Sequence, residues 1–261
     1  MTLSEESGRP YVRLLRAPNP GPMTLDGTNT WVIADQSEGA LVVDPGPAIV
    51  DHIEAIMAAS VPRLAMIALT HRHLDHSESA AALAERAGCG VRAADPQFRL
   101  GPAGLDGGDM LRVGALTLQV FETPGHTSDS RSLLLSGPDG VVRLITGDIV
   151  LGRGTTVITY PDGDLAAYFE SLDLLERIVR SRNVTELLPG HGPIVTDPLP
   201  WLAFYRRHRH ERLDQVRAAL AAGDRTASEI VARVYADVDR RVWPAAEQSV
   251  RSQLDYLRQR A

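Results

Sequence analysis

The sequence has a single cysteine, no lysine and no long apolar run. Cys89 alone cannot form an internal disulfide, so nothing in the chain is built for an oxidising compartment. No stretch approaches the ~20 consecutive apolar residues that a membrane-spanning helix needs. Residues 1–10 are polar, which is not the pattern of a secretory signal. These absences predict a cytoplasmic protein that contacts no membrane, and they leave the oligomeric state open.

All 27 basic residues are Arg, and 33 acidic residues bring the formal charge to −6. Residues 200–261 hold 12 Arg and 8 acidic residues, a net of +4, which leaves 15 Arg and 25 acidic residues, a net of −10, in the remainder. An acidic body argues against broad, non-specific nucleic-acid binding, whereas a mildly basic tail keeps local phosphate contacts open. A solvated helical surface is the simpler explanation of the tail.

The first 197 residues alternate short apolar runs, typical of strands, with helical patterns. The strand candidates are Tyr11–Arg16, Thr30–Ala34, Ala40–Asp44, Leu64–Leu69, Leu116–Phe121, Ser132–Leu135, Val141–Thr146 and Glu186–Leu188. The helix candidates are Ala48–Ala59, Ser77–Ala87 and Leu165–Ser181, the last preceded by Asp164 at the N-cap position. This interspersed order predicts an α/β domain over residues 1–197, with sheets covered by helices.

A purely helical pattern follows the prolines near residue 200. Apolar spacing predicts helices at Trp201–Ala222, Thr226–Tyr235 and Pro244–Arg258. Residues 198–261 are therefore expected to form a small helical or winged-helix-like domain.

The segment His71-Arg72-His73-Leu74-Asp75-His76 directly follows an apolar strand candidate. Three imidazoles and a carboxylate within six residues are each first-choice zinc ligands. One tetrahedral ion cannot easily take all four from so short a turn, but two ions can share them. His71 and His73 can reach one ion, and Asp75 and His76 its neighbour.

Three further segments supply more ligands at the ends of strand candidates. They are Pro124-Gly125-His126, Gly147-Asp148 and Pro189-Gly190-His191. Glycine before each ligand lets the backbone approach the metals closely. Each motif alone is weak evidence, and the four-residue cluster at His71 raises the value of all three. His52, His208 and His210 lie on helical patterns without such partners and are expected at the surface, and Cys89 is expected in the core.

Together these motifs resemble the metallo-β-lactamase superfamily over roughly residues 11–195. The resemblance implies an αββα sandwich with the ligands at one edge. It also implies that His71, His73 and His126 hold one zinc ion, that Asp75, His76 and His191 hold the second, and that Asp148 bridges the two. Asp44-Pro45-Gly46 matches a further motif of the family, which makes Asp44 a candidate partner of a ligand, although a simple strand-ending turn explains it equally well.

The presence of Asp148 and the absence of a cysteine ligand resemble the glyoxalase II and ribonuclease branches of the superfamily. The stretch 19–30 and the helical tail are most similar to the lactamase-β-like-2 group, whose animal members cleave single-stranded RNA. The resemblance thus predicts a two-metal phosphodiesterase acting on single-stranded RNA. A thioesterase or other carboxylic-ester hydrolase is the alternative, with weak β-lactam hydrolysis as a side activity, and a metal-bound regulatory protein is a third.

In either enzyme, two metals lower the pKa of a shared water and hold a hydroxide for attack, with Asp148 bridging and Asp75 orienting the nucleophile. Metal-bound histidines need acceptors on their other nitrogen, for which Thr70, Thr127 and Asp44 are candidates by position. Substrate contacts are expected from the loop after Asp148, at Thr155, Thr156 and Tyr160, and more weakly from Asn29 and Thr30.

Overall fold

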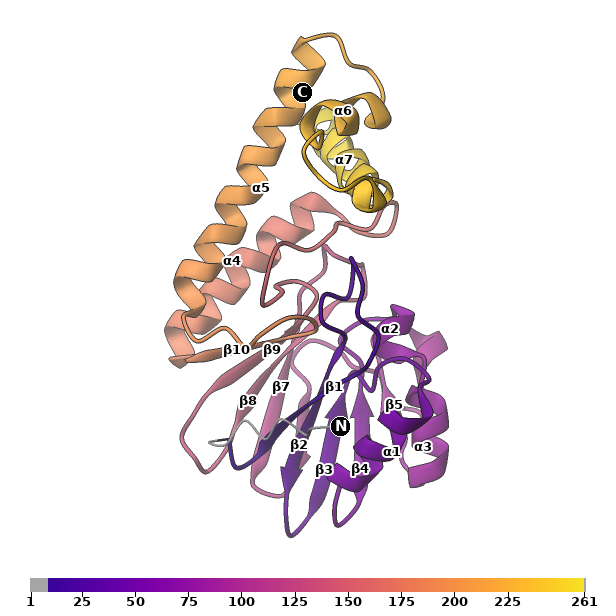
Figure 1. Ribbon diagram of the computed structural model, residues 1–261. Coiled ribbons are helices and arrows are strands. Elements are labelled where there is room, and N and C mark those ends of the chain that lie inside the picture. The colour runs from indigo at the N-terminus through magenta and orange to yellow at the C-terminus, as the bar shows by residue number, and fades with distance from the viewer. Residues whose placement is uncertain (1–8, 261) are drawn as a thin grey trace.

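Two five-stranded sheets face each other in the computed structural model, which describes residues 9–260 (Figure 1). The first sheet has the order β1 (Val12–Arg16), β2 (Asn29–Asp35), β3 (Gly39–Val43), β4 (Leu64–Ala68) and β5 (Gly90–Arg92). The second has the order β10 (Glu186–Pro189), β9 (Arg143–Gly147), β8 (Arg131–Ser136), β7 (Leu116–Glu122) and β6 (Met110–Val113). The β3–β4, β4–β5 and β9–β10 pairs are parallel and the other pairs antiparallel.

Three apolar layers hold this sandwich together. The central layer lies between the sheets and includes Trp31, Leu41 and Leu118. The outer face of the first sheet is covered by α1 (Val50–Ala59) and α3 (Ala80–Ala87), and that of the second by α4 (Leu165–Arg182). The predicted αββα arrangement is confirmed, and the buried alternate residues of the strands explain why each sheet needs a partner on both faces.

The tail consists of three α-helices, α5 (Pro198–Ala221), α6 (Ala227–Val234) and α7 (Trp243–Arg258), with a 3₁₀ turn at Arg240–Val242. Thr226 caps α6 in a capping box with Glu229. The first half of α5 packs on α4 through residues such as Leu202 and Tyr205, and its last turns form a separate core with α6 and α7. The predicted domain boundary at 197/198 therefore falls where α5 begins, although α5 contributes to both cores.

The sequence pattern missed two short strands and a helix break. β5 and β6 have only three and four residues and lie at sheet edges, so they carry little periodicity. The helix expected at Ser77–Ala87 is divided into α2 (Leu74–Ser77) and α3, with a further 3₁₀ turn at Pro96–Phe98. Within residues 9–260, every helix is too short or too polar to cross a bilayer.

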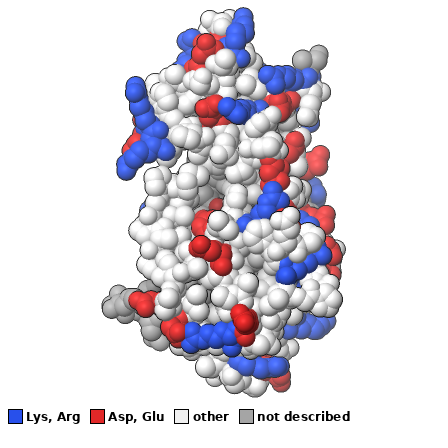
Figure 2. All heavy atoms as spheres, turned by 90° about the vertical axis from the view of Figure 1, so that its right-hand side faces the viewer, with Lys and Arg blue, Asp and Glu red and all other residues white. Residues whose placement is uncertain are grey.

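The tail stands over one end of the sandwich. Figure 1 shows α7 above the sheet edge at which α2 lies, with α5 along the opposite side. Seen from the side of α2, the surface has a hollow at mid-height between the helical tail and the sandwich, with acidic atoms beside it (Figure 2). The arrangement leaves one edge of both sheets open toward the space under the tail.

Candidate metal centre

All seven predicted ligands follow the ends of four strands. The loop after β4 supplies His71, His73, Asp75 and His76; the loops after β7, β9 and β10 supply His126, Asp148 and His191. His73 stands at the N-cap of α2, so the single turn of that helix carries Asp75 and His76. Ser77 Oγ donates to the carbonyls of Arg72 (2.9 Å) and His73 (3.0 Å), which closes this turn.

One group of nitrogens converges on His73. His73 Nδ1 lies 3.0 Å from His71 Nε2 and 3.1 Å from His126 Nε2. Two nitrogens that bind one tetrahedral zinc ion at ~2.05 Å are about 3.3 Å apart, close to these separations. Three imidazoles this close cannot all be satisfied by protons they share, so the group fits a cation.

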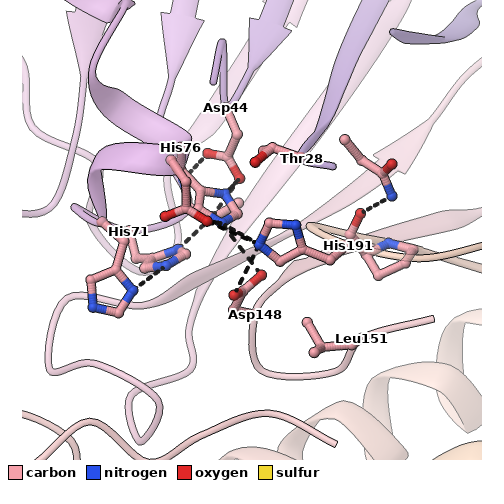
Figure 3. A network of polar contacts seen from close by, with 12 residues as sticks. Thr28, Asp44, His71, His76, Asp148, Leu151 and His191 are labelled. Atoms are coloured by element: carbon pink, nitrogen blue, oxygen red, sulfur yellow. Dashed lines mark hydrogen bonds and ion pairs between the residues drawn. The ribbon is translucent and has the colours of Figure 1, made fainter. Parts of the chain in front are cut away.

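A second group converges on His191. Its Nε2 lies 3.2 Å from both His76 Nε2 and Asp75 Oδ2, and His76 Nε2 lies 3.6 Å from Asp75 Oδ2. The structure thus divides six of the predicted ligands into the two triads His71, His73, His126 and Asp75, His76, His191. Figure 3 shows His71, His76 and His191 close to one another, with Asp148 beside His191.

Asp148 lies between the two triads. Its Oδ2 is 3.4 Å from His191 Nε2 and 3.9 Å from His126 Nε2, and its Oδ1 is 3.5 Å from His76 Nε2. Oδ1 is buried and makes no hydrogen bond. Because a buried carboxylate oxygen without a partner is costly, this atom would fit a ligand of a metal ion better than a structural role.

Glycine is required where the backbone passes beside the ligands. A Cβ added to Gly190 would meet Asp148 Oδ1 and would lie 2.7 Å from His76 Cε1. The Pro-Gly-His turn of the sequence therefore has a steric reason, since only glycine leaves room for ligands on both sides of it.

Asp44 holds two parts of the ligand loop at once. Asp44 Oδ2 accepts from His76 Nδ1 (2.9 Å) and from Thr70 Oγ1 (2.6 Å), and Oδ1 accepts from the Thr70 amide (2.7 Å). Thr70 Oγ1 also lies 3.0 Å from His71 Nδ1. Both predicted partner residues thus contact ligand histidines, and the bond from Nδ1 directs the Nε2 lone pair of His76 toward the centre.

Backbone carbonyls orient two other histidines. His126 Nδ1 donates to Val157 O (2.6 Å), with Thr156 Oγ1 3.2 Å away. His191 Nδ1 donates to Gly27 O (3.3 Å). In both cases the nitrogen that faces the centre is Nε2, as it is for a metal ligand held by its other nitrogen.

The two halves of the centre differ in how they hold charge. Burial opposes a proton on His76, but the carboxylates of Asp148, Asp75 and Asp44 outweigh it and raise the His76 pKa well above its ordinary value. The same balance of burial against Asp148 raises the pKa of His191 to about 9. For Asp148 burial opposes the charged form, yet the imidazoles of His191 and His76 lower its pKa. Burial lowers the pKa of the other three ligand histidines, so the first triad stays neutral, as metal ligands must be, while the carboxylates favour a cation beside the second.

Two predicted roles are corrected by the structure. Asn29 is fully buried and its amide donates to Pro189 O (3.0 Å) and Gly192 O (2.8 Å), so it holds the loop of His191 and cannot touch a substrate. Thr127 Oγ1 lies 2.6 Å from Ser130 Oγ, so its hydroxyl is used within its own loop and not on a ligand histidine.

The loop after Asp148 contains the other predicted substrate contacts. Thr156 is buried against His126, which makes it a partner of a ligand, while Thr155 is half-buried and Tyr160 is exposed. Thr30 is buried and donates from Oγ1 to Asp44 O (2.7 Å). Tyr160 and Thr155 are the two that can still reach a substrate.

His52 is buried, contrary to the expectation of a surface residue, whereas His210 is exposed and stacks on Phe169. Because the Thr30 hydroxyl gives its proton to Asp44 O, His52 Nε2, 2.9 Å away, donates to the Thr30 oxygen. The sequence around His52 gave no sign of this burial, because the burial arises when α1 packs beneath the loop that follows Asp44. Cys89 packs at the edge of the outer core, as expected.

Burial of His52 predicts a loss of stability in acid. Burial lowers its pKa from 6.5 to about 4, so between these values the unfolded chain binds the proton that the folded chain refuses. Stability therefore falls as pH drops from 6.5 to 4, by on the order of 3 kcal/mol for this group. His52→Gln keeps a donor for Thr30 and is expected to reduce the change of the urea midpoint between pH 6.5 and pH 4. An equal change of the midpoint with pH in both proteins would contradict the assignment.

The sequence profile of the metallo-β-lactamase superfamily matches residues 23–232, and that of the β-lactamase-associated winged helix domain matches residues 226–260. The chain belongs to the metallo-β-lactamase superfamily. It is accordingly a hydrolase, and α6 and α7 of its tail lie in the winged helix domain found with this family, which here consists of helices alone over the described residues.

Relatives within the superfamily differ in what their names say. A beta-lactamase-like protein 2 homolog of Caenorhabditis elegans is 30% identical over 84% of this chain and 74% of its own length. An atrochrysone carboxyl ACP thioesterase of Aspergillus chevalieri is 30% identical over 88% of this chain and 74% of its own. A beta-lactamase domain protein from Burkholderia ambifaria shares the fold, with a TM-score of 0.79 and 24% identity over 96% of this chain and 86% of that one.

Proposed function

We propose that this superfamily member is a two-zinc hydrolase of thioesters, or of related carboxylic esters, with an apolar acyl group. The observation that carries the proposal is the character of the exposed side chains around the ligands. Leu74 lies between two ligands and is 63% exposed; Met23, on the loop before Gly27, is 48% exposed; and Tyr160, on the loop that holds His126, is 37% exposed. Three segments that hold the metal centre thus each present one large apolar or aromatic side chain to solvent, which supports an apolar substrate group beside the centre.

The arginines on the same segments are neutralised by carboxylates. Arg72 pairs with Asp162 (2.8 Å) and Asp95 (3.3 Å), and Arg153 pairs with Asp26 (3.1 Å). A groove that follows a phosphodiester backbone needs cations free to replace counterions. The surroundings of the centre therefore suit an uncharged acyl group better than RNA, and the thioesterase relative agrees with this choice.

The protein's own groups fit attack of water on a carbonyl carbon. Two bound zinc ions would lower the pKa of a water and polarise the carbonyl oxygen. Asp75 directs Oδ2 to His191 while its side chain stays 30% exposed, so Oδ1 is available to accept a proton from the attacking water. Asp148, 10% exposed, is shielded from the opening and serves to hold charge between the triads.

Acyl-CoA thioesters of increasing chain length test the proposal. Zinc-loaded protein is mixed with acetyl-, butyryl- or octanoyl-CoA, and the released thiol is measured with a thiol-reactive dye. We expect kcat/KM to rise by up to about fourfold for each added methylene that becomes buried, at ~0.8 kcal/mol each.

Leu74→Ser should weaken this dependence without loss of stability, because the side chain is already exposed. Val61→Ser, an equally exposed control before β4 at the opposite end of the sheet, should not. No thiol release above background sinks the proposal.

Single-stranded RNA is a second candidate because one cavity under the tail is partly basic. It has a volume of about 330 Å³, and Tyr160 contributes to its lining together with Arg225, Arg251 and Arg258. Two carboxylates of the same lining, Glu247 and Asp255, pair with Arg251 (2.7 Å) and Arg258 (2.9 Å). Cleavage of a fluorescent single-stranded oligonucleotide, with binding that falls steeply as salt rises, would favour this candidate. Weak β-lactam hydrolysis remains a predicted side activity, whether the main substrate is a thioester or RNA.

A further inference from the structure

The loop after Asp148 is fixed at both ends by the C-terminal helices. At its start, Trp201 Nε1 donates to Leu151 O (2.8 Å) and Tyr205 Oη accepts from Leu151 N (2.8 Å). At its end, Ser249 Oγ of α7 accepts from Ile158 N (3.1 Å). Loops that face a site are commonly mobile, and this one has no regular secondary structure of its own. Its geometry therefore depends on α5 and α7.

Arg209 of α5 contacts the middle of this loop. Its side chain is buried, Nη2 donates to Thr156 O, and the guanidinium lies 4.9 Å from the centre of the Tyr168 ring. The Nε of Arg209 is buried without a hydrogen-bond partner. The side chain thus satisfies one backbone carbonyl of the loop and a ring face, and little else.

Other arginines of α5 are used differently. Arg206 pairs with Asp173 and Glu176, and Arg217 pairs with Asp214 (2.7 Å). Within residues 9–260, Arg209 has no carboxylate at ion-pair distance, although it is the buried one of the three. A buried cation without a counter-charge destabilises a fold, so its presence calls for a task at this position.

The peptide that Arg209 holds leads directly to a metal ligand. The carbonyl after Thr156 O in the chain is Val157 O, which accepts from His126 Nδ1 at 2.6 Å. We propose that Arg209 is a positioning residue of the active site, which holds the Thr156–Val157 backbone in place so that His126 presents Nε2 to the first triad. Helix α5, which joins the sandwich to the winged helix domain, is then part of the metal centre's support. The inference rests on the metal-dependent chemistry of the family, and not on the choice between thioester and RNA.

Titration of the metal-free protein with Co²⁺ alone tests this role without any substrate. Arg209→Met keeps the length and apolar stem of the side chain but removes the donors. Loss of a group that orients a ligand costs about 10- to 100-fold in metal affinity. We expect that range for one of the two equivalents in R209M, with an altered visible absorption of the bound Co²⁺. R209K should restore much of the affinity, and R217M, the exposed control on the same helix, should match wild type.

A purely structural role predicts a different pattern. It would change the urea midpoint of R209M while leaving the Co²⁺ isotherm and spectrum as in wild type, and that result overturns the proposal. Should R209M fail to fold, Ser249→Ala removes the acceptor of Ile158 N at the far end of the same loop. A weakened equivalent in S249A supports the proposal, and an unchanged isotherm for S249A counts against it.

Discussion

Asp148→Asn is expected to lower hydrolysis by more than about 100-fold, since even partners of metal ligands are worth 10- to 100-fold. The amide has nearly the shape of the carboxylate, but its nitrogen cannot bind a cation and its charge is gone. Oδ1 and Oδ2 of Asp148 face His76, His191 and His126 across both triads. Loss of the charge between the triads should therefore weaken the second ion most, and bound metal measured by elemental analysis should fall from two equivalents toward one.

Asp214→Asn is the matched control for this substitution. Asp214 is exposed on α5 and pairs with Arg217, so the same change of chemistry there should leave metal content and rate unchanged. Two retained equivalents and wild-type turnover in D148N would show that Asp148 does not bridge the ions, and the arrangement of the centre would have to be reconsidered.

Asp44→Asn is expected to lower metal affinity by about 10- to 100-fold although Asp44 is not a ligand. In the wild-type protein the Asp44 carboxylate accepts from His76 Nδ1, which keeps the imidazole proton on Nδ1 and leaves Nε2 free to bind a metal ion. An amide has one oxygen for these three donors. If its nitrogen replaces Oδ1, it meets the Thr70 amide N–H, and if it replaces Oδ2, it faces both Thr70 Oγ1 and His76 Nδ1. The second arrangement moves the imidazole proton to Nε2 and blocks the ligand position. Competition with a zinc-sensitive dye measures the loss.

Substitutions at positions of positive φ distinguish the loss of metal affinity from a loss of folding stability. Asp44 has φ of 54°, a conformation that Asn tolerates and Ala does not, so Asp44→Ala should lose an additional ~1 kcal/mol or more of folding free energy. Asn183→Ala is a control for that strain, because Asn183 has φ of 52° at the C-terminal end of α4. It should lower the melting temperature and leave metal affinity untouched. D44N with wild-type affinity would contradict the role given to Asp44.

The ligand set was predictable because its chemistry is concentrated in short motifs at strand ends. Asp, His and Gly at the ends of β4, β7, β9 and β10 are recognisable without knowledge of the sheet order, since the ends of strands in one sandwich lie near each other. The helices and most strands were predictable from apolar periodicity. β6 was not, because four residues beside a glycine-rich loop carry too little pattern.

Residues that support the centre from a distance were not predictable. Arg209 stands in the run Arg206-Arg207-His208-Arg209-His210. Its spacing of four residues from both Tyr205 and Leu213 places it on the buried face of α5, but the sequence does not show which backbone group it meets there. Asn29 resembles a loop residue that faces a substrate until β2 is placed beside the turn of His191. In both cases the role follows from a hydrogen bond between residues that are more than 50 positions apart in the sequence.

The unbroken course of α5 fixes how the winged helix domain sits on the sandwich. From Trp201 to Ala221 the helix contains no Pro or Gly, the usual causes of kinks, and it is anchored in the sandwich at one end and in the winged helix at the other. The two parts are therefore joined by a continuous helix and not by a hinge. Changes of specificity among relatives of this protein should accordingly be sought in loop side chains rather than in domain closure.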